Sequence, residues 1–367
     1  MRWRRFVLLA AAFTAYGARA VDYVVPVADV AGFFADLPED ATYVSFSAAA
    51  EYRCDRDIVL PARQVLVIDG KGCKLILGPS SNGFTVPVAD QKDAMRKTAN
   101  RYVIRDFGSI EGGKKAVDLR ATLNSTIQDC RFTGQSEVSI DLHFCLMARV
   151  RNVLVTKPKA KGIRVGCGDW PGASTSNSQS NHTVLEQCRV YCSATTTEAF
   201  TVLNSGGVHM LDCISEGQPA DYDLFLSATT DGDEGRAANN AVVKSFSLQN
   251  LHVEHRLRKA SIYVNMPPKA TVELTNIYWN SPITVPVLTY VSGQVHVNNI
   301  GWWNPDFIIS TRHAVPHVNF DGCHKSLVVT DAPDATGKKA GCLELRDPLR
   351  GQEKLDLSYV RTTRRAM

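Results

Sequence analysis

The sequence lacks an apolar run long enough to span a membrane. Its longest candidate, Phe6–Ala12, is well short of the roughly 20 residues that a spanning helix requires, and no other such run exists. Arg2, Arg4 and Arg5 precede this run, and the small-residue site Ala18-Arg19-Ala20 follows it. This order is typical of a secretory signal peptide.

We therefore expect residues 1–20 to be a signal peptide that is removed near Val21. The mature protein is then secreted, either extracellular or held at the cell surface. No membrane span is expected.

The mature chain also lacks an excess of charge of either sign. The full sequence has 41 Lys and Arg residues and 37 Asp and Glu residues, but residues 1–20 contain four arginines and no acidic residue. Removing them leaves 37 charges of each sign. A nucleic-acid-binding domain needs a basic stripe, so no nucleic-acid partner is expected.

Ten cysteines in an exported protein would ordinarily predict a disulfide framework. Cys130, Cys188 and Cys213, however, occupy a repeated position at which other units have Val, Leu or Ile. We interpret these three as small core residues. Bridges between Cys54 and Cys73, or between Cys323 and Cys342, remain open.

The repeated unit is a short phrase: an aliphatic residue, a spacer, an Asn, Asp or Gln, and then a residue that is usually aliphatic or Cys. Its polar members are separated by 23, 23, 35, 25, 38, 26 and 23 residues. They are Asp106, Asp129, Asn152, Gln187, Asp212, Asn250, Asn276 and Asn299. Units of this size stack on their neighbours to bury a shared core.

A second strand follows each phrase, with two inward-facing residues that begin 11 to 13 positions past the polar member. The inward pairs are Val117/Leu119, Ile140/Leu142, Ile163/Val165, Phe200/Val202, Leu224/Leu226, Ile262/Val264 and Leu288/Tyr290. Because no helical pattern separates the strands, the chain must wind around a core, and parallel crossovers are right-handed. The polar column is then a side-chain ladder at a bend.

These features predict an all-β, right-handed parallel β-helix, a solenoid. We expect an N-terminal cap at 21–57, the coil at 58–328 and a C-terminal tail at 329–367. The cap contains an amphipathic helix over Val27–Leu37, which Pro38 ends.

The opening of the chain supports a family resemblance. The expected helix is followed by Ile58-Val59-Leu60-Pro61 and Ile68-Asp69-Gly70-Lys71-Gly72. Together with the repeats, this resembles the pectin-lyase-like single-stranded right-handed parallel β-helix proteins, which include polysaccharide lyases, glycoside hydrolases and phage tailspike-like proteins. The resemblance covers roughly residues 29 to 325 and implies a fold rather than one activity.

Catalytic signatures of that family are missing. The chain has no Gly-His-Gly or Arg-Ile-Lys as in polygalacturonases, and no aspartate-rich calcium set followed by Arg-x-Pro-x-x-Arg as in pectate lyases. Catalytic residues of those enzymes therefore have no matching positions here.

Outward residues of the second strand are the sharper candidates for chemistry. Asp118, Asp141 and Arg164 fall on three consecutive units, with Arg120 and His143 one outward place further along. Rung spacing would hold the two carboxylates about 5 Å apart, as in a retaining glycosidase, with one pKa raised by its like-charged neighbour.

Other roles for these residues are open. Arg120 and Arg164 could hold a uronate carboxylate, and His143 could accept a proton. The row could also be an ordinary solvated charge ladder of little energetic value. No metal is assigned to it.

Two units are longer than the rest, and both extensions begin just after the second strand. Residues 166–181 include Asp169 and Trp170, and residues 227–240 include Asp231 and Asp233. We expect both loops to leave the coil at the same corner, two rungs apart, as the walls of a groove for a polymer.

In these loops, Trp170 would stack on a sugar or anchor its loop. Asp231 and Asp233 would contact substrate, bind calcium or form a solvated turn. The cofactor is therefore unknown, with calcium open.

The sequence predicts an exported protein that binds, and processes as a hydrolase or lyase, a polysaccharide or cell-surface glycan. The alternative is a non-catalytic, spike-like or adhesive protein. Either a monomer or a homotrimer is compatible, and outward Phe225 and Tyr263 would favour the trimer if they mediate assembly.

Overall fold

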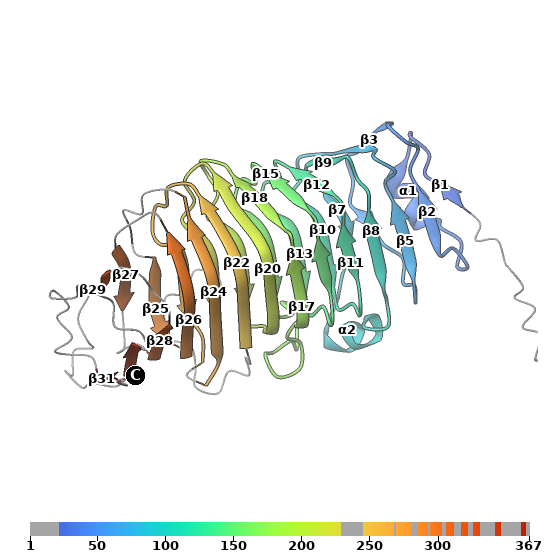
Figure 1. The fold of residues 1–367 in the computed structure, drawn as a ribbon. Helices are drawn as coiled ribbons and strands as arrows, with labels where there is room; N and C mark the ends of the chain where they lie inside the picture. Colours follow the sequence, from blue (N-terminus) through green and yellow to red (C-terminus); the bar gives the residue numbers. More distant parts are fainter. Residues whose placement is uncertain are drawn as a thin grey trace, which may run out of the picture.

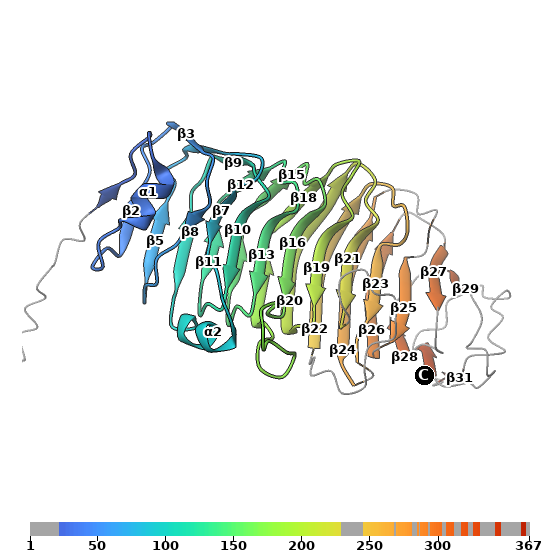
Figure 2. The same ribbon diagram turned by 180° about the vertical axis from the view of Figure 1, so that it is seen from behind.

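The computed structural model describes residues 22–228, 245–267, 269–280, 285, 287–292 and 294–302, and the backbone of five later strands. The chain winds into a straight coil with two long sheets (Figures 1 and 2). Pairing between the strands is parallel in both sheets. The predicted right-handed parallel β-helix is confirmed.

One sheet has 11 strands, which stack in chain order along the coil. They are β4 (Ile58–Val59), β7 (Asn82–Thr85), β10 (Lys115–Arg120), β13 (Val138–His143), β16 (Lys161–Gly166), β19 (Glu198–Leu203), β21 (Tyr222–Ser227), β23 (Ile262–Asn265), β25 (Leu288–Ser292), β27 (Asp306–Thr311) and β29 (Ser326–Thr330).

The other sheet has 20 strands and folds around a bend. Strands before the bend are β1 (Tyr23–Val24), β2 (Tyr43–Ser45), β5 (Leu66–Asp69), β8 (Tyr102–Arg105), β11 (Thr126–Gln128), β14 (Arg149–Arg151) and β17 (Asn181–Glu186). Strands after it are β3 (Glu51–Cys54), β6 (Lys74–Leu77), β9 (Ser109–Gly112), β12 (Arg131–Thr133), β15 (Leu154–Thr156) and β18 (Arg189–Cys192).

Further along, single strands run through the bend: β20 (Gly206–Gly217), β22 (Ser245–Glu254), β24 (Thr271–Trp279) and β26 (Gln294–Trp302). The sheet continues with β28 (His317–Asp321), β30 (Cys342–Leu345) and β31 (Arg361–Arg364). Paired strands therefore extend on both sides of the expected coil range 58–328. Residues 1–20, expected to be a signal peptide, lie outside the described chain.

The bend explains the repeated polar residue. Seven of the eight predicted positions have φ between +48° and +60°, from Asp106 to Asn276, and Asn and Asp tolerate this left-handed conformation better than most residues. The amide of Asn152 donates to Asp129 at 2.7 Å, Asn250 donates to Asp212 at 2.7 Å, and Asn276 donates to Asn250 at 3.0 Å. The predicted ladder is confirmed. The side chain of Asn299 lies outside the described part.

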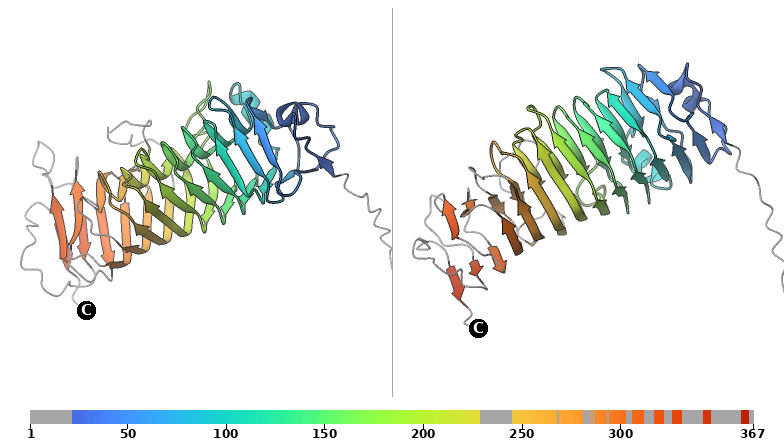
Figure 3. Two further views of the ribbon diagram at one scale, coloured as in Figure 1. Left: turned by 90° about the horizontal axis from the view of Figure 1, so that it is seen from above. Right: turned by 45° about the horizontal axis from the view of Figure 1, so that its top comes forward.

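Inward residues of the 11-stranded sheet form the core. Val117 pairs with Ile140 and Leu119 pairs with Leu142, and the same register continues through Ile163 and Val165. All of these side chains are buried. Figure 3 shows the coil from above and tilted forward, with its strands stacked side by side along its length.

Helix α1 (Val30–Ala35) lies at the N-terminal end of the coil, as expected (Figure 1). The Asp29 carboxylate accepts a hydrogen bond from the Gly32 amide at 2.9 Å and so caps the helix. Phe34 is buried and packs edge-on against Phe84, with ring centroids 5.8 Å apart. The helix thus covers the open end of the core.

Helix α2 (Gln91–Lys97) was not predicted. It is inserted between β7 and β8, and Asp90 caps it by accepting from the Asp93 amide at 2.7 Å. Among the described residues, no helix is long and apolar enough to cross a membrane.

Cysteines in the described part are free thiols. Cys130, Cys188 and Cys213 are buried in the core, as expected. The bridge between Cys54 and Cys73, which the sequence left open, is not formed, because Cys54 stands in register with Leu77 on the next strand rather than with Cys73. Cys323 and the side chain of Cys342 lie outside the described part.

Two neighbouring rungs of the ladder both carry a carboxylate, Asp106 and Asp129, and this gives a stability prediction. Burial and the neighbouring Asp69 and Asp129 raise the pKa of Asp106. In Asp129→Asn, the repulsion on Asp106 ends and the side-chain oxygen still accepts from Asn152. Gln128, which donates to Asp129 Oδ2 at 3.1 Å, can turn its own amide oxygen toward the new NH2 group. We expect a gain of about 0.5–1.5 kcal/mol in unfolding free energy at pH 7, measured by urea denaturation. Asp129→Ala should be destabilised, and a lower urea midpoint for Asp129→Asn would contradict the ladder argument.

Candidate functional site

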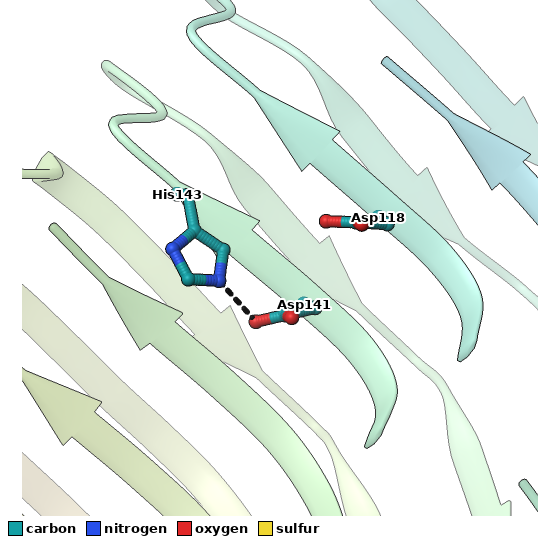
Figure 4. A group of neighbouring side chains, drawn as sticks. All are labelled: Asp118, Asp141 and His143. Atoms are coloured by element: carbon teal, nitrogen blue, oxygen red, sulfur yellow. Dashed lines mark ion pairs between the residues drawn. The ribbon is translucent and has the colours of Figure 1, made fainter. Parts of the chain in front are cut away.

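The predicted row of charged residues is formed in register on the face of the 11-stranded sheet that points away from the core. Asp118 pairs with Asp141, Asp141 pairs with Arg164, and Arg120 pairs with His143. One carboxylate oxygen each of Asp118 and Asp141 and one ring nitrogen of His143 all lie within 4.8 Å of one another. Figure 4 shows the three side chains. This distance agrees with the rung spacing expected from the sequence.

The row is not a solvated ladder. The side chains of Asp118, Asp141 and His143 are 7%, 0% and 6% exposed. That alternative is wrong, because a neighbouring loop and the cationic side chains cover the row. Lys115 and Arg164, with 9% and 15% exposure, belong to the same buried network.

Asp141 is the centre of this network, and both of its oxygens are fully occupied. Its Oδ1 accepts from Arg164 Nε at 2.8 Å and faces His143 Nε2 at 2.9 Å. Its Oδ2 accepts from Arg164 Nη2 at 2.7 Å and forms an ion pair with Lys115 Nζ at 2.7 Å.

Burial opposes ionisation of Asp141, but His143 and Arg164 outweigh it and hold the pKa of the carboxyl well below its ordinary value. The raised pKa that we expected for one member of the pair is therefore not found at Asp141. A low pKa disfavours proton donation by this residue, and the groups around both oxygens block its attack on a substrate.

His143 is held between two acceptors. Its Nδ1 lies 2.8 Å from the carbonyl oxygen of Cys167, and its Nε2 lies 2.9 Å from Asp141 Oδ1. Arg164 Nη2, a donor, also lies 3.4 Å from Nε2, so the roles of the two ring nitrogens depend on the tautomer. Both nitrogens face protein groups and the side chain is only 6% exposed, so this arrangement does not present His143 to a substrate for the proton-acceptor role that the sequence suggested.

Asp118, Arg120 and Asp169 form the open end of the network. Asp118 accepts one hydrogen bond at each oxygen, from Arg120 Nε at 3.1 Å and from Lys115 Nζ at 3.2 Å. Arg120 Nη1 also contacts Asp169 Oδ1. Asp169 is 48% exposed. Arg120 therefore joins a buried carboxylate of the sheet to an accessible carboxylate of the loop.

Lys115 was missed by the sequence reasoning. It stands on β10 three residues before Asp118, and its ammonium lies between the carboxylates of Asp118 and Asp141. The only sequence signal was a lysine on the same strand. Lys115 occupies the position between the carboxylates that a bound cation would take, so two carboxylates and an imidazole do not make a convincing metal site here.

Trp170 is buried and cannot stack on a sugar. It packs against Phe144, with ring centroids 6.2 Å apart, and its indole Nε1 donates to Gln91 Oε1 at 2.9 Å. Gln91 belongs to α2, so Trp170 anchors its loop to this helix. The anchoring role, rather than the sugar-binding one, is the correct interpretation.

The second predicted loop is described only at its start. It leaves after β21, two rungs along from the loop that leaves after β16, as expected. Asp231 and Asp233, with the calcium and substrate roles considered for them, lie outside the described residues.

A second buried ionic group lies inside the coil. His255 Nε2 is 2.6 Å from Asp223 Oδ1, and the hydroxyls of Ser215 and Ser261 each donate to this carboxylate at 2.6 Å. Both ionisable side chains have no exposed surface. His252, its neighbour in the sequence, instead lies 3.7 Å from Glu254 at the surface. Sequence analysis alone could not tell which of these two histidines is buried.

Comparisons with known proteins give only distant similarity. No protein-family model matches the sequence, and a search of curated proteins gives no match. Two solved structures of the catalytic domain of a GH87 alpha-1,3-glucanase, one with nigerose and one variant with tetrasaccharides, are each 12% identical with a TM-score of 0.43. Each alignment covers 85% of this chain and 69% of the other. At these values the similarity carries no argument about activity, and the fold assignment rests on the strand pairing.

Proposed function

We propose that this protein is an exported polysaccharide hydrolase that acts at the open end of the charged row. The observation that carries the proposal is the Arg120 guanidinium, which contacts both Asp118 and the half-exposed Asp169. These two carboxyl groups of the network can each accept a further hydrogen bond. One would protonate the glycosidic oxygen while the other assists attack on the sugar.

The rest of the row acts as a fixed support. Asp141 is saturated by Arg164, Lys115 and His143, so these groups position Asp118 and Arg120 rather than react. The same contacts disfavour a lyase reaction, because both ring nitrogens of His143 face protein groups and Arg164 is already paired with a carboxylate. A long coil with regular rungs suits an extended polymer as substrate.

The test is a panel of neutral and acidic polysaccharides, followed by reducing ends and by the ultraviolet absorbance of unsaturated uronates. We expect new reducing ends without unsaturated products. Asp118→Asn and Asp169→Asn should each lower the rate by about 10²–10⁴-fold, while the bend variant Asp129→Asn keeps full activity. Cleavage that survives both substitutions in folded protein would contradict the assignment, and unsaturated products would favour a lyase.

A non-catalytic, glycan-binding coil is the second candidate. The observation that favours it is the burial of Asp141 and His143. Retention on polysaccharide without cleavage would support it. The trimer contact considered for this candidate gains no support, because Phe225 and Tyr263 stack on each other at 4.5 Å and are buried within the chain.

A further inference from the structure

A groove follows the outside of the bend in the 20-stranded sheet, on a different sheet from the charged row. It consists of two cavities of about 550 and 410 Å³ that share Asp212 and Ile214 in their linings. Together they extend over five rungs, from Asn152 to Asn276. The strands that form it, such as β20, β22 and β24, are seen in Figure 1, and the sheet with the charged row is seen in Figure 2.

The lining of this groove is amphiphilic and repeats with the rungs. Each rung contributes an amide or carboxylate side chain at the bend, which is a hydrogen-bonding group at nearly constant spacing. Ile214 and the rings of His252 and Tyr278 form a wall beside it. Tyr278 is 38% exposed, and His252 meets its ring at 5.1 Å and 78°. A sugar polymer has the matching surface, with hydroxyls at its edges and apolar ring faces.

Charge in the groove favours an uncharged ligand. Its lining has one carboxylate, Asp212, one guanidinium, Arg189, and the imidazole of His252. Asp212 already accepts a hydrogen bond from Asn250 at 2.7 Å, and Arg189 lies 3.5 Å from Glu216. The charges of Asp212 and Arg189 cancel, and neither group needs a counter-ion from a ligand. A polyanion would gain nothing here that a neutral chain does not.

We propose that this groove binds one strand of a neutral polysaccharide, with Tyr278 stacking on a sugar ring. The site is separate from Asp118 and Asp169, so it would hold the polymer on the enzyme without taking part in cleavage. This role rests on the proposed function, but the binding itself is measurable without any cleavage.

The experiment uses the full chain and soluble neutral glucans, dextran and laminarin, with polygalacturonate as the acidic comparison. Retention is measured by affinity electrophoresis and affinity by calorimetry. We expect binding to at least one neutral glucan that persists at high salt. Tyr278→Ala should weaken it about tenfold, which corresponds to loss of one aromatic contact. Tyr278→Phe should retain binding, and the exposed Met95→Ala on α2 serves as a control with unchanged affinity.

The outcomes separate this inference from the proposed function. Three results would each overturn the groove proposal. They are wild-type affinity in a folded Tyr278→Ala variant, a preference for polygalacturonate over the neutral glucans, and failure to bind any neutral glucan. Loss of cleavage in Asp118→Asn with unchanged glucan retention supports two separate sites. If glucan retention depends on Tyr278 but no polysaccharide is cleaved, the groove proposal is supported and the hydrolase proposal is rejected. If polysaccharide is cleaved but retention does not depend on Tyr278, the hydrolase proposal is supported and the groove proposal is rejected.

Discussion

Asp141→Ala is expected to lose about 3–5 kcal/mol of unfolding free energy, because Lys115 and Arg164 would lose the buried anion that they share and His143 would lose its carboxylate partner. Lys115, Arg164 and His143 all contact this carboxylate, which has no exposed surface. Urea denaturation at pH 7 measures the loss. Asp169→Asn is the control, since its half-exposed ion pair should contribute no more than about 1 kcal/mol. Equal effects of the two substitutions would show that Asp141 is not the centre of the network.

Asp141 should also account for part of the loss of folding stability at acid pH. Because the folded pKa of Asp141 lies well below its ordinary value of 3.8, its stabilising contribution is present above about pH 3.8 and is lost as the pH falls through the folded pKa. The stability of the unsubstituted protein should therefore drop more steeply below pH 3.8 than that of Asp141→Ala. Parallel acid curves would contradict the pKa direction.

Asp223→Ala is expected to cost about 3 kcal/mol or more, since it leaves the buried His255 and two serine hydroxyls without their acceptor. Thermal and urea unfolding near pH 6 measure the effect. Glu254→Gln is a matched control, because it removes a histidine–carboxylate contact of 3.7 Å at the surface. That change should cost less than about 1 kcal/mol.

The pair between Asp223 and His255 also has a pH signature. Burial lowers the pKa of His255, but the charge and hydrogen bond of Asp223 outweigh it, so the pKa is raised above 6.5. The contribution of the pair is complete below pH 6.5 and is lost as the pH rises through the folded pKa. Asp223→Asn should remove this alkaline loss of stability. An unchanged pH profile between pH 6 and 9 would contradict it.

The coil itself was predictable because its signals are local. A polar residue that tolerates positive φ marks each bend, and alternate apolar residues mark the inward face of each strand. Counting from Asp129 to Asn152, or from Val117 to Ile140, gives the register directly. The alignment of Asp118, Asp141 and Arg164 follows from the same count. Helix α2 escaped prediction because its short polar sequence has no strong apolar period.

The chemistry of the row was decided by contacts between distant segments. Asp169 reaches Arg120 from a loop 49 residues away in the sequence, and Trp170 ties that loop to Gln91 of α2. Sequence spacing placed the carboxylates near each other, but it could not show that Lys115 lies between them or that His143 faces two acceptors. Protonation and access depend on these neighbours, because burial removes the solvent that would otherwise set both.

The sequence by itself therefore determined the architecture, the rung register and the residues that share a face, since all three depend on periods of two residues and on single bend positions. Only the tertiary structure decided which charged groups are saturated, which remain accessible and where a groove opens. Those properties arise from side chains that meet across rungs and loops, and such meetings are not encoded in any local pattern.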